Sequence, residues 1–256
     1  MSDLEVQQSG RALWLTLNRP EHLNALTGEM VVEAISRLRG ATARDDVRVV
    51  VLTGRGAAFS AGADLGGEDA QERYDAGSVD AANHVVRAIV ELDKPVVCGL
   101  NGVAAGVGLS VALACDLVVA TASASMTLAF TRLGLMPDGG ATSTVAASVG
   151  RARAMRMALL SDLLTAEEAY AAGLVSHVFA DEEYDAGLTK IVARLEAGAP
   201  LAFAATKKAV NAATLGGLGD AFGRERAGQA VLLRTADVAE GMRAFAERRR
   251  PDFTGR

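Results

Sequence analysis

Several features that identify a protein class are missing from this sequence. Its only cysteines, Cys98 and Cys115, have neither a CxxC nor a zinc-ligand spacing, so we expect both to be reduced and buried. No uncharged apolar run reaches the roughly eighteen residues of a membrane span. The formal charge of −5 argues against broad nucleic-acid binding. The first ten residues lack a charged segment followed by an apolar one, so we expect no export signal and a cytoplasmic location.

The common cofactor and nucleophile motifs are also missing. There is no GxxxxGK[ST], no GxGxxG after a strand and no GxSxG, which disfavours a phosphate-binding loop, a nicotinamide site and a serine-hydrolase elbow. His22, His84 and His177 lie far apart and have no ligand spacing. We therefore predict no metal site and no bound cofactor.

What the chain does contain is an alternation of apolar strands and amphipathic helices. The patterns predict strands within 4–18, 47–54, 95–102 and 117–122, and helices within 27–42, 79–95, 106–116, 140–150, 151–160 and 165–173. The run at 47–54 is continuous and β-branched, which is typical of a strand covered on both faces. This alternation predicts an α/β architecture.

The chain changes character toward its C-terminus. From about residue 183 onward the patterns are helical, including 199–213 and 227–249. We place a domain boundary between 1–197 and 198–256. The polar stretch 66–78 is predicted to be a loose loop that shapes a pocket.

Two glycine-containing segments follow buried strands, "FSAGADL" at 59–65 and "NGVAAGVGLS" at 101–110. Glycine lets the backbone approach a ligand closely. If both segments lie at strand ends, N–H groups from each can converge on one oxygen, and a helix starting near Gly106 adds its positive dipole end. This pattern is compatible with an oxyanion hole made of backbone, and also with ordinary close packing.

At these residues the sequence resembles the crotonase (enoyl-CoA hydratase/isomerase) superfamily. The stretches that carry the resemblance occur in family order at 17–26, 50–65, 94–120, 133–140, 172–175 and 245–255. The resemblance implies a spiral of ββα units with a C-terminal helical trimerisation region. It also implies a homotrimer or hexamer acting on a coenzyme A thioester, with coenzyme A present only as part of the substrate.

The resemblance also carries over individual residues. The oxyanion-hole donors map onto the N–H groups of Ala63 and Val107; the family usually has glycine at the second position, and valine keeps the N–H but narrows the acyl pocket. The substrate-binding positions that match are Arg19, Ala61, Asp64, Leu65, Gly106, Ser110, Phe130, Phe245 and Arg248. Lys94, Lys207 and the C-terminal arginines are further candidates for the coenzyme A phosphates, and the sequence does not choose among them.

Hydratases of this family typically supply two glutamates, at the positions that are Ser110 and Phe130 here. Neither residue is acidic, which disfavours two-glutamate hydration. The "LMPDGG" segment instead places Asp138 where the similar enoyl-CoA and ring-epoxide isomerases use an aspartate. A carboxylate there can take a C2 proton and return it at C4, since base and acid act in sequence. Asp138 is equally compatible with capping the helix that follows it.

We therefore expect an acyl-CoA isomerase with Asp138 as the proton shuttle. Two alternatives stay open: an enoyl-CoA hydratase, and a non-catalytic acyl-CoA-binding or scaffold protein. The sequence does not identify the acyl chain or choose between trimer and hexamer.

Overall fold

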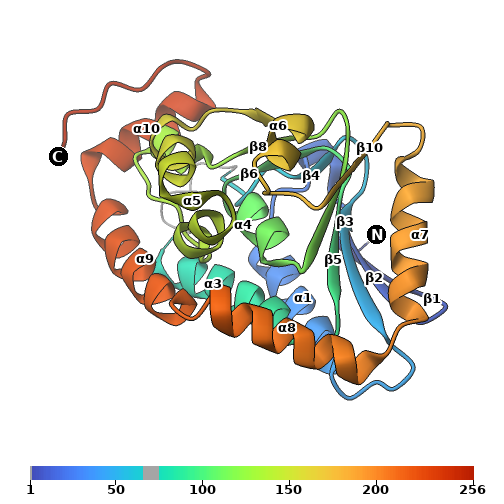
Figure 1. Ribbon diagram of the computed structural model, residues 1–256. Coiled ribbons are helices and arrows are strands. Elements are labelled where there is room, and N and C mark those ends of the chain that lie inside the picture. The colour runs from blue at the N-terminus through green and yellow to red at the C-terminus, as the bar shows by residue number, and fades with distance from the viewer. Residues whose placement is uncertain (1, 66–74) are drawn as a thin grey trace.

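The computed structural model describes residues 2–65 and 75–256, which form two β-sheets surrounded by helices (Figure 1). One sheet has the strand order β1-β2-β3-β5-β7-β10 and the other has β4-β6-β8-β9. The strands are β1 Leu4–Ser9, β2 Ala12–Leu17, β3 Val49–Gly54, β4 Ala58–Ser60, β5 Val96–Leu100, β6 Val103–Ala105, β7 Leu117–Thr121, β8 Ser125–Thr127, β9 Leu164–Thr165 and β10 His177–Phe179. The helices are η1 Pro20–His22, α1 Gly28–Ala41, α3 Ala76–Glu91, α4 Gly106–Ala114, η2 Ala129–Leu133, α5 Ala141–Leu160, α6 Ala166–Ala171, α7 Tyr184–Glu196, α8 Pro200–Thr214, α9 Leu218–Leu232 and α10 Ala236–Ala246.

The strands come in consecutive pairs that contribute to both sheets. β3, β5 and β7 pair in parallel in the larger sheet, while β4, β6 and β8 pair in parallel in the smaller one. Helices follow these pairs, so the chain repeats a ββα unit and the predicted crotonase-like spiral is confirmed. The sequence patterns missed β4, β6 and β8 because three residues are too few to show a period.

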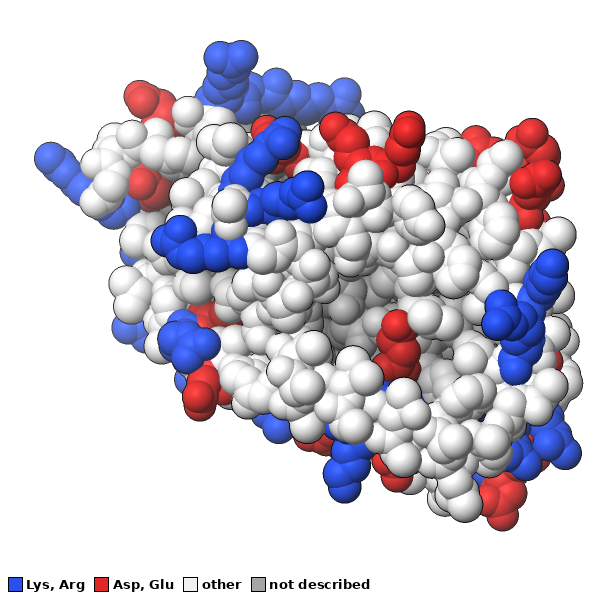
Figure 2. Space-filling model, in the orientation of Figure 1, with Lys and Arg blue, Asp and Glu red and all other residues white. Residues whose placement is uncertain are grey.

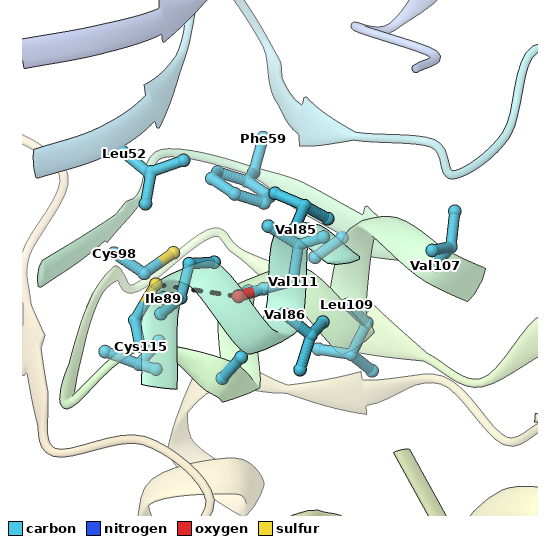
Figure 3. Packing of buried hydrophobic residues seen from close by; sticks show 14 of the residues in the cluster. Leu52, Phe59, Val85, Val86, Ile89, Cys98, Val107, Leu109, Val111 and Cys115 are labelled. Carbon is cyan, nitrogen blue, oxygen red and sulfur yellow. Dashed lines mark hydrogen bonds between the residues drawn. The ribbon is translucent and has the colours of Figure 1, made fainter. Parts of the chain in front are cut away.

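The larger sheet is buried on both faces, as the β-branched run at 47–54 predicted. Val49 and Val51 pack toward α7, whereas Val50 and Leu52 belong to the main core on the opposite face. This alternation follows the two-residue period of a strand. Figure 3 shows Leu52 in the main core beside side chains of β4, α3 and α4. Both cysteines are buried there as free thiols, which confirms their predicted placement.

Side-chain caps start helices α1 and α3. Thr27 accepts a hydrogen bond from the Met30 N–H at 3.2 Å and begins α1, as its sequence pattern predicted. Asp75 accepts from the N–H groups of Gly77 and Ser78 and begins α3. Residues 66–74 of the predicted loop lie outside the described residues. The prediction of a loop is wrong for 76–78, which are helical because Asp75 caps them.

The C-terminal helices cover one side of the core. α9 packs against α3 and α5, and α10 packs against η2. The predicted helix at 227–249 is in fact two helices, because Thr235 caps a new helix at the Val238 N–H. The boundary between 1–197 and 198–256 falls between α7 and α8, and the independence of the two parts stays a prediction. In the described residues, no helix has the length and apolar character needed to span a membrane.

Candidate active site

The two glycine segments lie against each other, as their positions after strands predicted. Gly62 has φ of +102°, and a Cβ on it would lie 2.9 Å from the Ala105 carbonyl oxygen. A side chain at Gly62 would therefore be both strained and too close to backbone. Gly106, with φ of +52°, begins α4 beside it. The ends of β4 and β6 are thus in contact at the start of α4.

This contact brings the Ala63 and Val107 backbones to one place. Leu26 forms a parallel bridge with Ala63, using the Leu26 N–H and its carbonyl oxygen to bond Gly62 and Asp64 at 2.7 and 3.1 Å. Val107 is in the first turn of α4, where N–H groups have no partner within the helix. Within residues 2–65 and 75–256, neither the Ala63 N–H nor the Val107 N–H donates to a protein acceptor. Both groups can therefore serve a ligand oxygen.

A pocket of about 230 Å³ opens beside these two residues. It lies between α1 and α3, and its walls are mostly apolar. The lining residues are Leu26, Thr27, Gly28, Val31, Ala63, Asp64, Ser78, Ala81, Ala82, Val85 and Val107. Ser78 comes from the stretch that the sequence predicted to shape a pocket. The cavity has the composition of a site for an apolar group with a few polar atoms at its edge.

Arg19 and Asp64 are joined by an ion pair. The Arg19 guanidinium lies 2.9 Å from Asp64 Oδ2 and 3.5 Å from Asp3 Oδ2, and it donates to the Ala25 carbonyl at 2.8 Å. These bonds tie the segment before α1 to the Ala63 loop. Arg19 therefore holds the pocket edge, and its charge is already matched by two carboxylates.

Two other candidate cations are also engaged by the protein. The Lys94 ammonium donates to the carbonyls of Ala41 and Arg44 at 2.6 and 2.5 Å, and burial lowers its pKa. Lys207 lies 2.8 Å from Asp116 Oδ2. Burial raises the pKa of Asp116, and the Lys207 charge opposes that rise. Both lysines therefore act as structural ties between segments.

Asp138 lies in a tightly held turn between η2 and α5, and its exposure is 0%. Ser110, on α4, donates its hydroxyl to the Asp138 carbonyl at 2.8 Å. The carboxylate oxygen Oδ2 accepts from the Gln229 side-chain amide at 2.8 Å. The Ser110 side chain thus bonds the backbone of Asp138, and the Gln229 side chain bonds the Asp138 carboxyl group.

The predicted helix cap is supplied by another residue. The N-cap position of α5 is Gly140, with φ of +77°, and the acceptor for the first turn is Glu225. The Glu225 carboxylate accepts from the Gly140 N–H at 2.7 Å, the Thr142 N–H at 2.9 Å and the Thr142 hydroxyl at 2.5 Å. Burial raises the pKa of Glu225, and these donated bonds oppose that rise. The interpretation of Asp138 as the N-cap residue of α5 is therefore wrong, because the N-cap position lies two residues later, at Gly140.

Glu225 and Gln229 were missed by the sequence analysis. They lie four residues apart on α9, a helix whose sequence shows no clear apolar face, and both are fully buried. A polar pair at this spacing is common on solvated helix faces, so the sequence carries no signal that separates this pair from an exposed one.

Several predicted residues lie apart from the pocket. Phe130 is buried in the core, and Ala61 and Leu65 flank the Ala63 loop without lining the cavity. Phe245 and Arg248 are exposed near the end of α10, which contributes nothing to the cavity lining. In this single chain Ala63, Asp64 and Val107 therefore line one pocket, whereas Phe245 and Arg248 do not.

Asp138 also lies outside the lining of the pocket, and Val107 connects the two. Val107 lines the cavity, and its Cγ2 lies 3.6 Å from the point that a Cβ on Gly139 would occupy. The valine side chain therefore lies next to the turn that carries Asp138. A residue without a side chain at position 107 would leave that space open.

Charge is unevenly distributed over the surface. Figure 2 shows basic side chains gathered over α5 and α10, while the middle of the same face is largely uncharged and hollowed. Arg151, Arg153 and Arg156 of α5 are exposed. In the part of the chain that the structure describes, no group of three or more His, Cys, Asp and Glu side chains is arranged to hold a metal ion.

Comparisons with known proteins agree with this architecture. Residues 8–256 match the family model described as Enoyl-CoA hydratase/isomerase. The 1,2-epoxyphenylacetyl-CoA isomerase of Escherichia coli K12 is 38% identical, with 94% of each chain covered. A probable enoyl-CoA hydratase of Rhodobacter capsulatus is 41% identical over the same shares. A crystal structure of an enoyl-CoA hydratase from Mycobacterium avium subsp. paratuberculosis superposes with a TM-score of 0.92 at 46% identity, covering 99% of both chains.

Proposed function

The chain belongs to the enoyl-CoA hydratase/isomerase family, and we propose that within it the protein is an enoyl-CoA isomerase that uses Asp138 as a single proton shuttle. The observation that carries the proposal is the set of side chains at three positions. Ser110 and Phe130 have no carboxyl group, whereas Asp138 has one. In the structure, Ser110 donates to the Asp138 backbone and Phe130 is buried in the core. The likeness to an epoxyphenylacetyl-CoA isomerase supports the same choice.

The proposed reaction has two proton transfers and one stabilised intermediate. The Asp138 carboxylate takes a proton from C2 of a 3-enoyl thioester, and the electron pair moves onto the thioester oxygen. The N–H groups of Ala63 and Val107 donate to that oxygen. The enolate then collapses as the Asp138 carboxyl group returns the proton to C4, so the double bond moves from C3 to C2 and no atom is gained or lost.

The backbone donors supply much of the expected rate. A donor aimed at a developing oxyanion contributes about 3–4 kcal/mol, judged from the removal of such donors in other enzymes. Ala63 and Val107 suit this role because their segments are already fixed by the Leu26 bridge and by α4. Little reorganisation is needed when charge develops.

The thioester is proposed to place its acyl group in the pocket between α1 and α3. Val107 then lies between the acyl group and the Asp138 turn, and we propose that its side chain turns aside when substrate binds. We further propose a cytoplasmic homotrimer or hexamer in which Phe245 and Arg248 contact the ligand of a neighbouring subunit.

An enoyl-CoA hydratase is the second candidate, because a probable hydratase at 41% identity and a hydratase structure at 46% identity resemble the chain at least as closely as the isomerase at 38% does. In that case Asp138 would position a water molecule. A non-catalytic acyl-CoA-binding protein is the candidate of another class.

One experiment separates these three candidates. The wild type is incubated with a panel of 3-enoyl-, 2-enoyl- and epoxide-CoA thioesters, and mass spectrometry distinguishes isomerisation, which leaves the mass unchanged, from the gain of one water. We expect isomerisation, and we expect Asp138→Asn to lower kcat by about 100- to 10,000-fold while thioester binding persists. Asp93→Asn, the same change at an exposed position, is the control.

Each alternative has its own outcome. Gain of water as the main product establishes the hydratase. Tight binding without turnover of any thioester establishes the binding protein. Full turnover by Asp138→Asn removes Asp138 from the mechanism.

A further inference from the structure

We propose that Gln229 of α9 is a positioning residue for Asp138, and that Glu225, one turn earlier, fixes the turn on which Asp138 lies. This inference rests on the proposed function of Asp138. It adds that the proton shuttle depends on a helix that lines no part of the pocket.

The Gln229 amide is oriented by the backbone of a single residue. Its oxygen accepts from the Met136 N–H at 3.3 Å and its nitrogen donates to the Met136 carbonyl at 2.9 Å. These two bonds leave only one sensible assignment of the amide oxygen and nitrogen. The second N–H hydrogen is then directed at Asp138 Oδ2, 2.8 Å away.

This bond has a chemical consequence for the shuttle. An N–H that donates to a carboxylate favours its ionised form and fixes its orientation. The proposed reaction begins with an ionised Asp138 that takes the C2 proton. Gln229 therefore holds one carboxylate oxygen and keeps the group in the form that the first step needs.

Glu225 fixes the backbone of the same turn. It bonds the N–H groups of Gly140 and Thr142 at 2.7 and 2.9 Å, directly after Asp138. Gln229 and Glu225 are both at 0% exposure and are separated by one helical turn. The two side chains thus hold the turn on either side of Asp138, through Met136 and through Gly140.

The same helix is attached to the pocket wall. Arg226 of α9 lies 2.7 Å from Asp80 of α3, and the Arg87 guanidinium of α3 lies 5.2 Å from the centre of the Phe222 ring of α9. Since α3 lines the pocket, α9 connects the acyl-binding wall to the Asp138 turn.

The test compares Gln229→Met and Gln229→Glu with the wild type, using the thioester that the wild type isomerises. Methionine keeps the length of glutamine and removes the donor, and glutamate keeps the shape and adds a carboxyl group beside Asp138. Gln7→Met is the control, because Gln7 is exposed on β1. kcat, KM and the pH dependence of kcat/KM are measured for each, with circular dichroism to verify folding.

We expect Gln229→Met to lower kcat by about 10- to 100-fold, as a misplaced reacting group does, with KM changed less than about threefold. We also expect the acid limb of kcat/KM to move to higher pH, and to move further in Gln229→Glu, because two adjacent carboxyl groups share a proton. Glu225 of α9 is the titratable side chain bonded to this turn, and Ser110 of α4 carries no charge. Glu225→Gln is therefore measured in parallel, and we expect it to move the limb less than Gln229→Glu does, because Glu225 bonds the backbone of the turn and not the Asp138 carboxyl group.

An unchanged kcat, or a lower kcat with an unmoved acid limb, overturns the inference. If Gln229→Met does not fold, the same two readouts on Gln229→Glu decide. Failure of the proposed function is a separate result, since it requires a wild type without isomerase activity or an active Asp138→Asn. An active wild type, an inactive Asp138→Asn and an unaffected Gln229→Met overturn only the role of Gln229.

Discussion

The proposed oxyanion donors of the pocket are backbone N–H groups, whereas the Asp138 turn is held by side chains that come from a distant helix. Ala63 and Val107 offer N–H groups from segments next to their own strands, and any residue except proline supplies such a group. The Asp138 turn depends on Glu225 and Gln229, which lie 85 and 91 residues away in sequence from their partners Gly140 and Asp138. The first arrangement tolerates changes of side chain, and the second does not.

Replacing Glu225 by leucine is the largest test of this contrast. The buried N–H group of Gly140 and the part-buried N–H group of Thr142 would lose their acceptor. An unsatisfied buried group costs about 1–3 kcal/mol and the Thr142 bonds are lost as well, so we expect Glu225→Leu to lower the free energy of unfolding by about 3 kcal/mol. Urea denaturation measures the change.

Glu182→Leu, on the exposed surface before α7, is the matched control and should change the free energy of unfolding by less than about 0.5 kcal/mol. A loss in Glu225→Leu no larger than in this control would contradict the role of Glu225 in holding the turn.

Replacing Gly62 by alanine tests the backbone half of the site. The new Cβ would lie 2.9 Å from the Ala105 carbonyl oxygen at a φ of +102°, so the two glycine segments must separate. We expect kcat/KM to fall by about 10- to 100-fold, because displacing a proposed oxyanion donor loses part of the about 3–4 kcal/mol that such a donor contributes. The free energy of unfolding should fall by about 1–3 kcal/mol as well.

Gly40→Ala is the control for Gly62→Ala, because a Cβ at Gly40, in α1, meets nothing within 4 Å. Alanine there should leave kcat/KM unchanged and stabilise the helix slightly. Equal kinetics for the two variants would show that the close approach at Gly62 does not position the donors.

The same contrast explains what the sequence could predict. The strand at 47–54 and the Thr27 cap depend on residues close together in the chain, and both were predicted correctly. The sequence pointed to Asp138 but not to the residues that hold its turn, because these residues belong to a helix whose buried face depends on tertiary packing. Arg19 was expected to bind a ligand. No pattern in the sequence around it indicates that its guanidinium forms ion pairs with Asp3 and Asp64.

The smallest expected effect is a pH dependence that also isolates Glu225. Burial raises its pKa above the ordinary value of about 4.5, so in the folded state the carboxyl group keeps its proton to higher pH than in the unfolded state. Between those two pKa values the folded state binds more protons, and its stability therefore falls as pH rises, by at most about 1.4 kcal/mol per pH unit for one proton.

Glu225→Gln has no such titration, so the stability of the wild type relative to this variant should decrease from about pH 4.5 upward and then become constant. Glu182→Gln, the same substitution at an exposed position, is the matched control. A wild-type stability that instead rises relative to Glu225→Gln over this range would mean that the three donated bonds outweigh burial, and Glu225 would then act as a charged cap of α5.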